Sequence, residues 1–298
     1  MRFTTFVHED KIYAGIVCSN GYYSFSDLFG KKRNSPKTVL EFIQKYEEKA
    51  MPDFEAIIAE NGLQPFGADC VKLCSPIPMP LRNIICLGKN YEDHAKEVVQ
   101  TKLETQNENY IPSAPVYFAK IANPATGDGG VIPLHSDFTR KVDYEVELAV
   151  IIGKETKCIE PENVESVIFG YTILNDVTAR DVQSAYGQWY FGKSLDGFCP
   201  MGPHIVTKDE IEFPVKLNIS CRVNEETRQS SNTELLIYDI PYIISELSKG
   251  ITLYPGDIIA TGTPGGIGHA MTPPEYLKSG DKIECEIENI GILTNTAE

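Results

Sequence analysis

The sequence predicts an α+β fold with a β-dominated core and a small N-terminal α+β domain. Short strand-like segments separated by proline and glycine turns are frequent, whereas helical patterns are few. Strands and helices do not alternate regularly, which argues against a doubly wound parallel sheet. A proline-rich stretch divides the chain unequally, and 298 residues are enough for a large core and a smaller attached unit.

Residues 1–74 are predicted to form the small domain. They begin with an antiparallel meander, because turn-forming clusters at residues 8–10 and 19–21 interrupt a segment of alternating apolar and polar residues. Ser35-Pro36 is expected to start a short helix, with the serine as N-cap and the proline at the first helical position. A second helix is expected over residues 53–60.

Residues 75–82 are assigned as a proline-rich linker and residues 83–298 as the second domain. Three prolines within residues 76–80 impose a stiff, extended connector there. The strands predicted after it cover residues 83–87, 142–152, 168–174, 216–223, 257–260 and 282–288. The helices predicted after it cover residues 91–99, 178–186 and 240–249.

The composition excludes several classes of function. The formal charge of −15 repels nucleic-acid backbones, and no cluster of lysine and arginine offsets it, so no nucleic-acid partner is expected. The longest apolar runs, such as 148–152, are too short to cross a bilayer, and the first residues lack the basic and apolar regions of an export signal. We therefore expect a cytoplasmic protein without a membrane partner, whose eight cysteines are reduced thiols.

Two glutamates form the clearest candidate for a metal site. Glu145 and Glu147 lie at positions i and i+2 of a predicted strand, so their side chains project from the same face, with Cα atoms roughly 7 Å apart. A polar outer strand face would explain an isolated pair of this kind. The apolar run 149–152 instead indicates a largely buried strand, where paired carboxylates are costly unless a cation neutralises them.

Asp176 offers a third carboxylate. It follows the apolar segment 169–174 and precedes a helical stretch, where it is equally suited to be a helix N-cap. Three carboxylates without a matching set of histidines or cysteines favour a hard cation, Mg²⁺ or Mn²⁺, over zinc.

His94 and Glu97 are a candidate acid–base pair. They stand three positions apart on a predicted helix and can face one another. A carboxylate that orients an imidazole makes it a general base for activating water. The same spacing also describes an ordinary exposed ion pair.

Arg180, Gln183 and Lys193 are candidates for substrate binding. Arg180 and Gln183 share a helix face, and a guanidinium there can bind a carboxylate through two hydrogen bonds. Lys193 follows an aromatic run, where desolvation can make it a proton donor or an anion ligand. Surface charge explains either cation as well.

The glycine-rich segment 261–268, TGTPGGIG, lacks the spacing of nucleotide-binding loops. A tight turn that brings Thr263 and backbone amides toward a carboxylate ligand fits it better.

Five motifs occur in order along the chain: GKNYxxHxxE, DYExEL, NDxTARDxQ, GKSxD and TGTPxGxG. Together they resemble the fumarylacetoacetate hydrolase family over about residues 82–298, and the preceding segment resembles the small N-terminal domain of its longer bacterial members. Within the family, the chain is most similar to bacterial members that resemble oxaloacetate decarboxylase and acylpyruvate hydrolase. The resemblance implies a mixed β-roll or sandwich core and a homodimer.

The resemblance also implies roles for the candidate residues. The metal ligands it implies, for Mg²⁺ or Mn²⁺, are Glu145, Glu147 and Asp176. The catalytic residues it implies are Lys193 and a water-activating pair on a closing lid, His94 and Glu97. The substrate contacts it implies are Arg180, Gln183, Lys193 and Thr263. The polar stretch 98–110 is expected to be linked to the lid.

The activity that the resemblance implies is metal-dependent C–C bond cleavage of a small 2-oxo acid or dicarboxylate, by oxaloacetate decarboxylation, acylpyruvate hydrolysis or both. The cation would stabilise the enolate that forms. One alternative is a 2-hydroxyhepta-2,4-diene-1,7-dioate isomerase or decarboxylase of aromatic catabolism. Another is a non-catalytic, metal-binding regulatory protein of the same fold, against which the complete set of candidate ligands argues.

Overall fold

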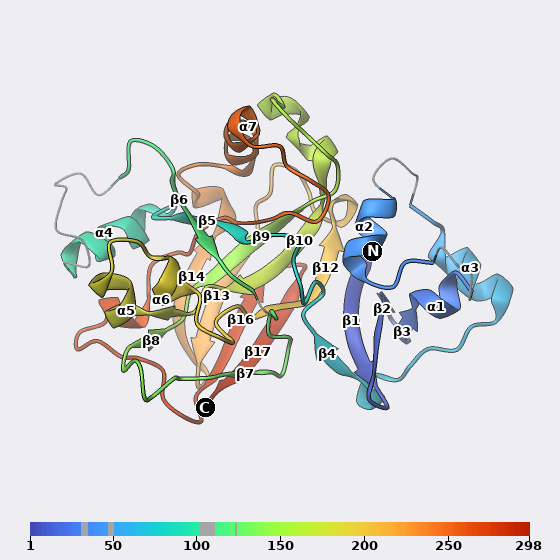
Figure 1. Ribbon diagram of the computed structural model, residues 1–298, viewed down its shortest axis with the longest axis horizontal. Coiled ribbons are helices and arrows are strands. Elements are labelled where there is room, and N and C mark those ends of the chain that lie inside the picture. The colour runs from blue at the N-terminus through green and yellow to red at the C-terminus, as the bar shows by residue number, and fades with distance from the viewer. Residues whose placement is uncertain (31–34, 47–50, 102–110, 123) are drawn as a thin grey trace.

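Two β-sheets form the core of the protein in a computed structural model that describes residues 1–30, 35–46, 51–101, 111–122 and 124–298 (Figure 1). The larger sheet is mixed and has ten strands, with β4 (Lys72–Cys74) paired to β1 at its side. In spatial order its other strands are β3 (Gly21–Ser24), β2 (Lys11–Cys18), β1 (Arg2–His8), β12 (Met201–Thr207), β10 (Ile168–Asn175), β9 (Val146–Ile152), β15 (Ile258–Ala260), β5 (Ile84–Gly88) and β6 (Val116–Lys120).

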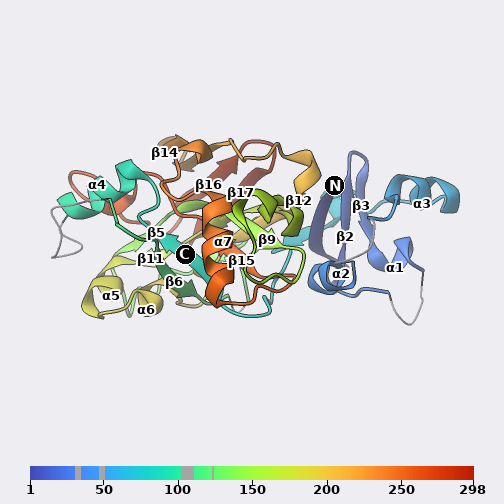
Figure 2. The ribbon, with the colours of Figure 1, turned by 90° about the horizontal axis from the view of Figure 1, so that it is seen from above.

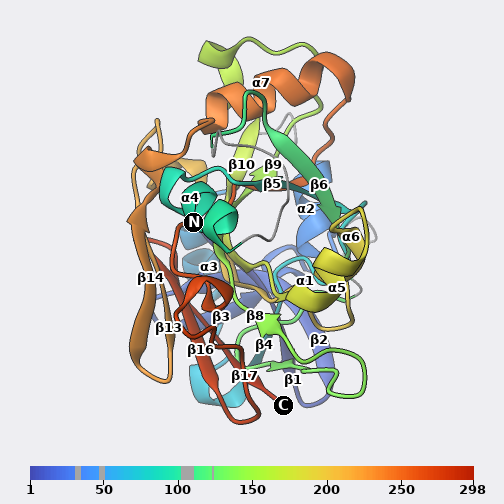
Figure 3. The same cartoon turned by 90° about the vertical axis from the view of Figure 1, so that its left-hand side faces the viewer.

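The second sheet lies as a layer beside the first (Figure 3). Its order is β14 (Glu226–Asn232), β13 (Asn218–Val223), β16 (Lys282–Ile287), β17 (Gly291–Ala297) and β7 (Val131–Ile132). All seven residues of β9 are buried, because the strand lies inside the larger sheet and also packs against β13 and β16. This two-layer, sheet-dominated core confirms the predicted fold class.

Helices cover the ends and edges of the sheets (Figure 2). They are α1 (Phe25–Leu28), α2 (Val39–Lys45), α3 (Phe54–Asn61), α4 (Glu92–Gln100), α5 (Arg180–Ala185), α6 (Tyr190–Lys193) and α7 (Ile240–Gly250). The first three lie at the end of the molecule opposite to α4, α5 and α6 (Figure 1). A short pair, β8 (Val142–Asp143) and β11 (Thr178–Ala179), lies near α5. Within the described residues, no helix has the length and apolar character needed to span a membrane.

The N-terminal segment continues the larger sheet. Strand β1 pairs with β12, with Arg2 opposite Val206. Phe3 and Phe42 lie 5.2 and 6.4 Å from Phe169 of β10, measured between ring centroids. The division into a domain of residues 1–74, a linker and a second domain stays a prediction, and the sheet crosses that division without a break.

Three local expectations were wrong. Thr38, not Ser35, caps α2 by accepting a hydrogen bond from the Glu41 amide, because the Ser35 hydroxyl donates to Gly30 O instead. The strand expected over residues 142–152 is interrupted between β8 and β9. The helix expected over residues 178–186 begins as strand β11, and α5 starts only at Arg180.

Further strands were not predicted from the sequence, namely β4, β6, β7, β12, β14 and β17. Of the lid-linked stretch 98–110, residues 102–110 lie outside the described residues.

Candidate metal centre and substrate pocket

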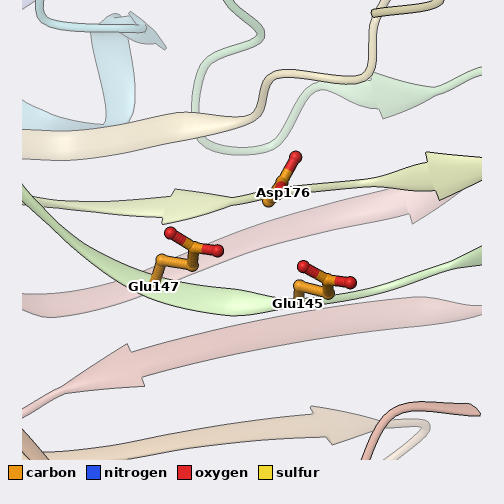
Figure 4. Close-up of side chains that lie close together, drawn as sticks. All are labelled: Glu145, Glu147 and Asp176. Carbon is orange, nitrogen blue, oxygen red and sulfur yellow. The ribbon is translucent and has the colours of Figure 1, made fainter. Parts of the chain in front are cut away.

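The three predicted carboxylates lie together at the centre of the larger sheet (Figure 4). Glu147 is on β9, Glu145 directly precedes β9, and Asp176 directly follows β10. These antiparallel strands pair Glu147 with Leu174, and the Asp176 amide donates to Glu145 O at 2.8 Å. One oxygen of each carboxylate lies within 4.8 Å of those of the others, and all three side chains are buried. Asp176 is therefore part of an acidic cluster and caps no helix.

Ionisation of Glu147 has an electrostatic cost in this cluster. It accepts a hydrogen bond from the Gly262 amide at 2.9 Å. Burial raises the pKa of Glu147 well above its usual range, and the carboxylates of Asp176 and Glu145 raise it further. A cation placed among the three carboxylates would remove this cost. Three buried carboxylates without histidine or cysteine also match the ligand preference of Mg²⁺ or Mn²⁺, so the residues fit such a cation.

Glu145 is held ionised by two cations. Lys193 Nζ lies 2.7 Å from its Oε2, and Arg180 Nη1 lies 2.7 Å from its Oε1. Burial alone would raise the pKa of Glu145, but Lys193 and Arg180 lower it to about 2. Lys193 also donates to Asp176 Oδ2 at 2.6 Å. Burial lowers the pKa of Lys193, whereas Asp176 and Glu145 raise it more, so the net pKa lies above the ordinary value. These two carboxylates therefore favour the charged ammonium form of Lys193, and its role as a proton donor or an anion ligand stays a prediction.

Lys120 is a second buried lysine, which sequence analysis missed. It is fully buried, and its Nζ lies 2.8 Å from Asp176 Oδ1 and 3.0 Å from Val177 O. It also donates to the backbone oxygen of Lys193. Lys120 is the last residue of β6, a strand that was not predicted. Only the pairing of strands in the sheet places Lys120 beside Asp176, so the local sequence gives no sign of this contact.

Arg180 links the acidic cluster to the substrate pocket. Its Nε donates to Asp143 at 2.9 Å and its Nη1 donates to Gln183 at 3.2 Å, so the predicted shared helix face is present. Asp143, in turn, accepts from the amides of Gly268 and His269. Arg180 Nη2 is buried and has no hydrogen-bond partner in the described part of the chain. One guanidinium nitrogen therefore remains for a ligand.

His94 and Glu97 face one another on α4. His94 Nδ1 lies 2.8 Å from Glu97 Oε1, and Glu97 Oε2 accepts from the Gly266 amide at 2.9 Å. Gly266 has a φ of +106°, and a Cβ there would lie 1.9 Å from Arg228 O, so only glycine fits. The glycine-rich segment 261–268 thus contributes amides to Glu97, Glu147 and Asp143.

One cavity collects six of the predicted site residues: His94, Glu145, Arg180, Gln183, Lys193 and Thr263. An apolar wall completes it, formed by Leu87, Val98, Phe118 and Trp189. Thr263 accepts a hydrogen bond from Gln229, whose own carbonyl accepts from the Val146 amide. Gln229 was not predicted from the sequence. It lies on the polar, largely exposed strand β14, 83 residues away from its partner Val146.

Comparisons with known proteins give the site a context. A family model described as "Fumarylacetoacetate (FAA) hydrolase C-terminal" matches residues 83–298. The chain is 50% identical over 225 residues to the oxaloacetate tautomerase YisK of Bacillus subtilis (strain 168), covering 76% of this chain and 72% of that protein.

Several solved structures cover the whole of this chain, and two of them bear on the site. One is a fumarylacetoacetate hydrolase from psychrophilic Exiguobacterium antarcticum, with 39% identity, a TM-score of 0.83 and 99% of its chain covered. The other is a maleylpyruvate hydrolase from Sphingobium sp. SYK-6 in complex with manganese(II) and pyruvate, with 30% identity, a TM-score of 0.75 and 98% of its chain covered.

Proposed function

The chain belongs to the fumarylacetoacetate hydrolase family, and from this premise we propose that it is a divalent-metal-dependent enzyme that acts on a small 2-oxo acid such as oxaloacetate. The observation that carries the proposal is the cluster of Glu145, Glu147 and Asp176 beside a cavity that also contains His94, Arg180 and Lys193. Oxaloacetate is the substrate in the name of the Bacillus relative, and the Sphingobium structure holds manganese and a 2-oxo acid.

The charge balance of the site supports an anionic substrate. Four buried carboxylates (Asp143, Glu145, Glu147 and Asp176) face three buried cations (Lys120, Arg180 and Lys193). Fully ionised, this set has a formal charge of −1, and a divalent cation would change it to +1. Such a pocket attracts a 2-oxo carboxylate even though the whole chain is acidic.

The residues that would hold Mg²⁺ or Mn²⁺ are Glu145, Glu147 and Asp176. When bound, the cation supplies a Lewis acid that stabilises the negative charge of the substrate's enolate. Arg180 Nη2 donates to the substrate carboxylate, and Gln183 holds the guanidinium through Nη1. The Lys193 ammonium supplies a further positive charge at the acidic cluster.

His94 is assigned the proton transfer. When its Nδ1 donates to Glu97, its Nε2 carries the lone pair and can take a proton at the cavity. That proton comes from the substrate in an enolisation. In acylpyruvate hydrolysis it comes from the water that attacks the distal carbonyl.

Two outcomes of this chemistry have support. C–C bond cleavage, by decarboxylation or hydrolysis, is the reaction that the sequence motifs imply, and the water-activating pair suits hydrolysis. Keto–enol tautomerisation of oxaloacetate needs the same electron sink, removal of a proton from the enol hydroxyl or from C3, and delivery of a proton to the other of these two atoms, and the 50% identical Bacillus relative carries that name. The homodimer and the cytoplasmic location stay predictions.

One experiment separates these outcomes. Enol-enriched oxaloacetate is mixed with the Mn²⁺-loaded protein, and loss of the enol absorbance is followed together with pyruvate formation. Tautomerisation removes the enol band without pyruvate, whereas decarboxylation produces pyruvate. Acetylpyruvate, fumarylpyruvate and 2-hydroxyhepta-2,4-diene-1,7-dioate complete the panel. Failure to accelerate any of these reactions over Mn²⁺ alone would overturn the proposal and favour a metal-binding regulatory protein.

A further inference from the structure

Lys120 is a fully buried lysine that has no direct part in the proposed reaction. It is the last residue of β6, the strand at one edge of the larger sheet, and its exposed fraction is 0%. Burial of an ammonium has a large desolvation cost, which an apolar side chain of similar volume would avoid. The charge at this position therefore needs an explanation other than packing.

The Lys120 ammonium joins two parts of the site. Its Nζ forms an ion pair with Asp176, at 2.8 Å from Oδ1, and donates to Val177 O at 3.0 Å. It also donates to the backbone oxygen of Lys193. Asp176 and Val177 directly follow β10, whereas Lys193 is the last residue of α6. One ammonium thus connects a candidate metal ligand with the end of the helix that carries Lys193.

The residue after Lys120 is tied to the same end of α6. The Ile121 amide donates to Ser194 Oγ at 3.2 Å, and Ser194 directly follows Lys193. Helix α6 also packs against β6 (Figure 3). The end of β6 therefore fixes the backbone from which the Lys193 side chain projects.

Both carboxylate oxygens of Asp176 contact an ammonium. Lys120 lies beside Oδ1, and Lys193 donates to Oδ2 at 2.6 Å. Lys193 also donates to Glu145 Oε2 at 2.7 Å, so Oδ2 lies on the side of Asp176 that faces Glu145 (Figure 4). The Asp176 carboxylate cannot turn away from the acidic cluster without breaking one of these ion pairs.

We propose that Lys120 is a positioning residue, which holds Asp176 in the orientation that binds the divalent cation. The inference rests on the proposed function and concerns the assembly of its metal site. Residues that contact a metal ligand but not the metal commonly change metal affinity by roughly 10- to 100-fold. A positive charge close to a dication would by itself weaken binding. Positioning and charge repulsion therefore predict effects of opposite sign when Lys120 is replaced.

The test compares the Mn²⁺ affinity of metal-stripped wild type and Lys120→Met, read from the electron paramagnetic resonance signal of free Mn²⁺. Methionine resembles lysine in length and has no charge. Lys120→Gln is a second neutral variant, whose amide can still donate to Val177 O. Lys208→Met is the matched control, because Lys208 also donates to a backbone oxygen, Glu165 O at 2.7 Å, and lies outside the pocket and the acidic cluster. Circular dichroism reports whether each variant is folded.

We expect both neutral variants to bind Mn²⁺ roughly 10- to 100-fold more weakly than wild type, and Lys208→Met to bind as wild type does. Unchanged or tighter binding in the folded neutral variants would overturn the assignment, because loss of a charge alone strengthens binding. Failure of both neutral variants to fold would assign Lys120 to the stability of the sheet and would overturn it as well.

A double-mutant cycle with Asp176→Asn then shows whether Lys120 acts through Asp176. In the Asp176→Asn background, Lys120→Met should change Mn²⁺ affinity by less than about threefold, because the contact it removes is already lost. Equal losses in both backgrounds would mean that Lys120 does not act through Asp176, which contradicts the proposal. If wild type binds Mn²⁺ and the Lys120 variants bind it equally well, only the role of Lys120 fails. Absence of Mn²⁺ binding to wild type would contradict the proposed function and the inference together.

Discussion

Glu147 lies fully buried beside two other carboxylates, and its ionisation sets a pH dependence that the metal-free protein should display. The pKa of Glu147 is raised in the folded state above its unfolded value of about 4.3. At a pH between these two pKa values, the folded chain therefore holds the Glu147 proton more tightly than the unfolded chain does. The contribution of Glu147 to the free energy of unfolding is fully present below the unfolded pKa, and it is lost as the pH rises through the folded pKa.

We therefore expect metal-free Glu147→Gln to gain stability relative to wild type as pH rises, by up to about 1.4 kcal/mol per pH unit in that window. Unfolding by urea in EDTA at pH 6 and pH 8 measures the difference. With saturating Mn²⁺ the advantage should disappear, because the cation favours the carboxylate. A difference between the two proteins that does not vary with pH would contradict the raised pKa.

Arg180 tests the contact with the substrate carboxylate. Arg180→Ala should lower kcat/KM by a factor that corresponds to a loss of roughly 2–4 kcal/mol in transition-state stabilisation, because a charged hydrogen bond is lost in a desolvated pocket. Arg180→Lys keeps a charge near Glu145 but lacks the second terminal nitrogen, so it should still raise KM. Arg222→Ala, at a partly exposed ion pair on β13 outside the pocket, is the control and should have little effect. Arg180→Lys with wild-type KM would exclude Arg180 Nη2 as a substrate contact.

Helix α4 is the element on which the two C–C cleavage reactions should separate. His94→Ala should reduce acylpyruvate hydrolysis by ~10²–10⁴, the usual contribution of a general base. Decarboxylation consumes no water nucleophile in its cleavage step, so it should suffer less. Both activities would be measured on one preparation at saturating Mn²⁺. Equal proportional losses would mean that His94 acts through helix position or a proton transfer shared by both reactions.

Burial explains only part of which strands could be predicted from the sequence, because β12 is almost wholly buried and was not predicted. Strands β9, β10 and β16 have buried apolar residues and were predicted, and the acidic cluster on β9 and β10 was predicted with them. Strand β14 is polar and largely exposed, so its sequence lacks an apolar pattern, and Gln229 was missed with it. Lys120 contacts Asp176 only through the pairing of distant strands, which local spacing cannot reveal. The site residues that were not predicted from the sequence, such as Lys120 and Gln229, therefore owe their place to partners that lie far away along the chain.

At the scale of the whole molecule, the continuous sheet predicts one cooperative unfolding transition. Phe3 and Phe42 pack against Phe169 across the predicted domain division, and β1 pairs with β12. Phe42→Ala should cost about 3–5 kcal/mol, as for a large side chain removed from a core. Calorimetry should give one peak in wild type and variant, with equal calorimetric and van't Hoff enthalpies. Two separate peaks would mean that residues 1–74 fold as an independent domain.

The central claim is that Glu145, Glu147 and Asp176 bind one divalent cation, and titration calorimetry with Mn²⁺ tests it most directly. The wild type should bind one Mn²⁺ per chain. Glu147→Gln should weaken binding at least roughly 100-fold, beyond the usual loss for an outer-shell partner. Glu286→Gln, a half-exposed carboxylate outside the cluster, should bind as wild type does. Unchanged affinity in Glu147→Gln, or no binding to the wild type, would contradict the account.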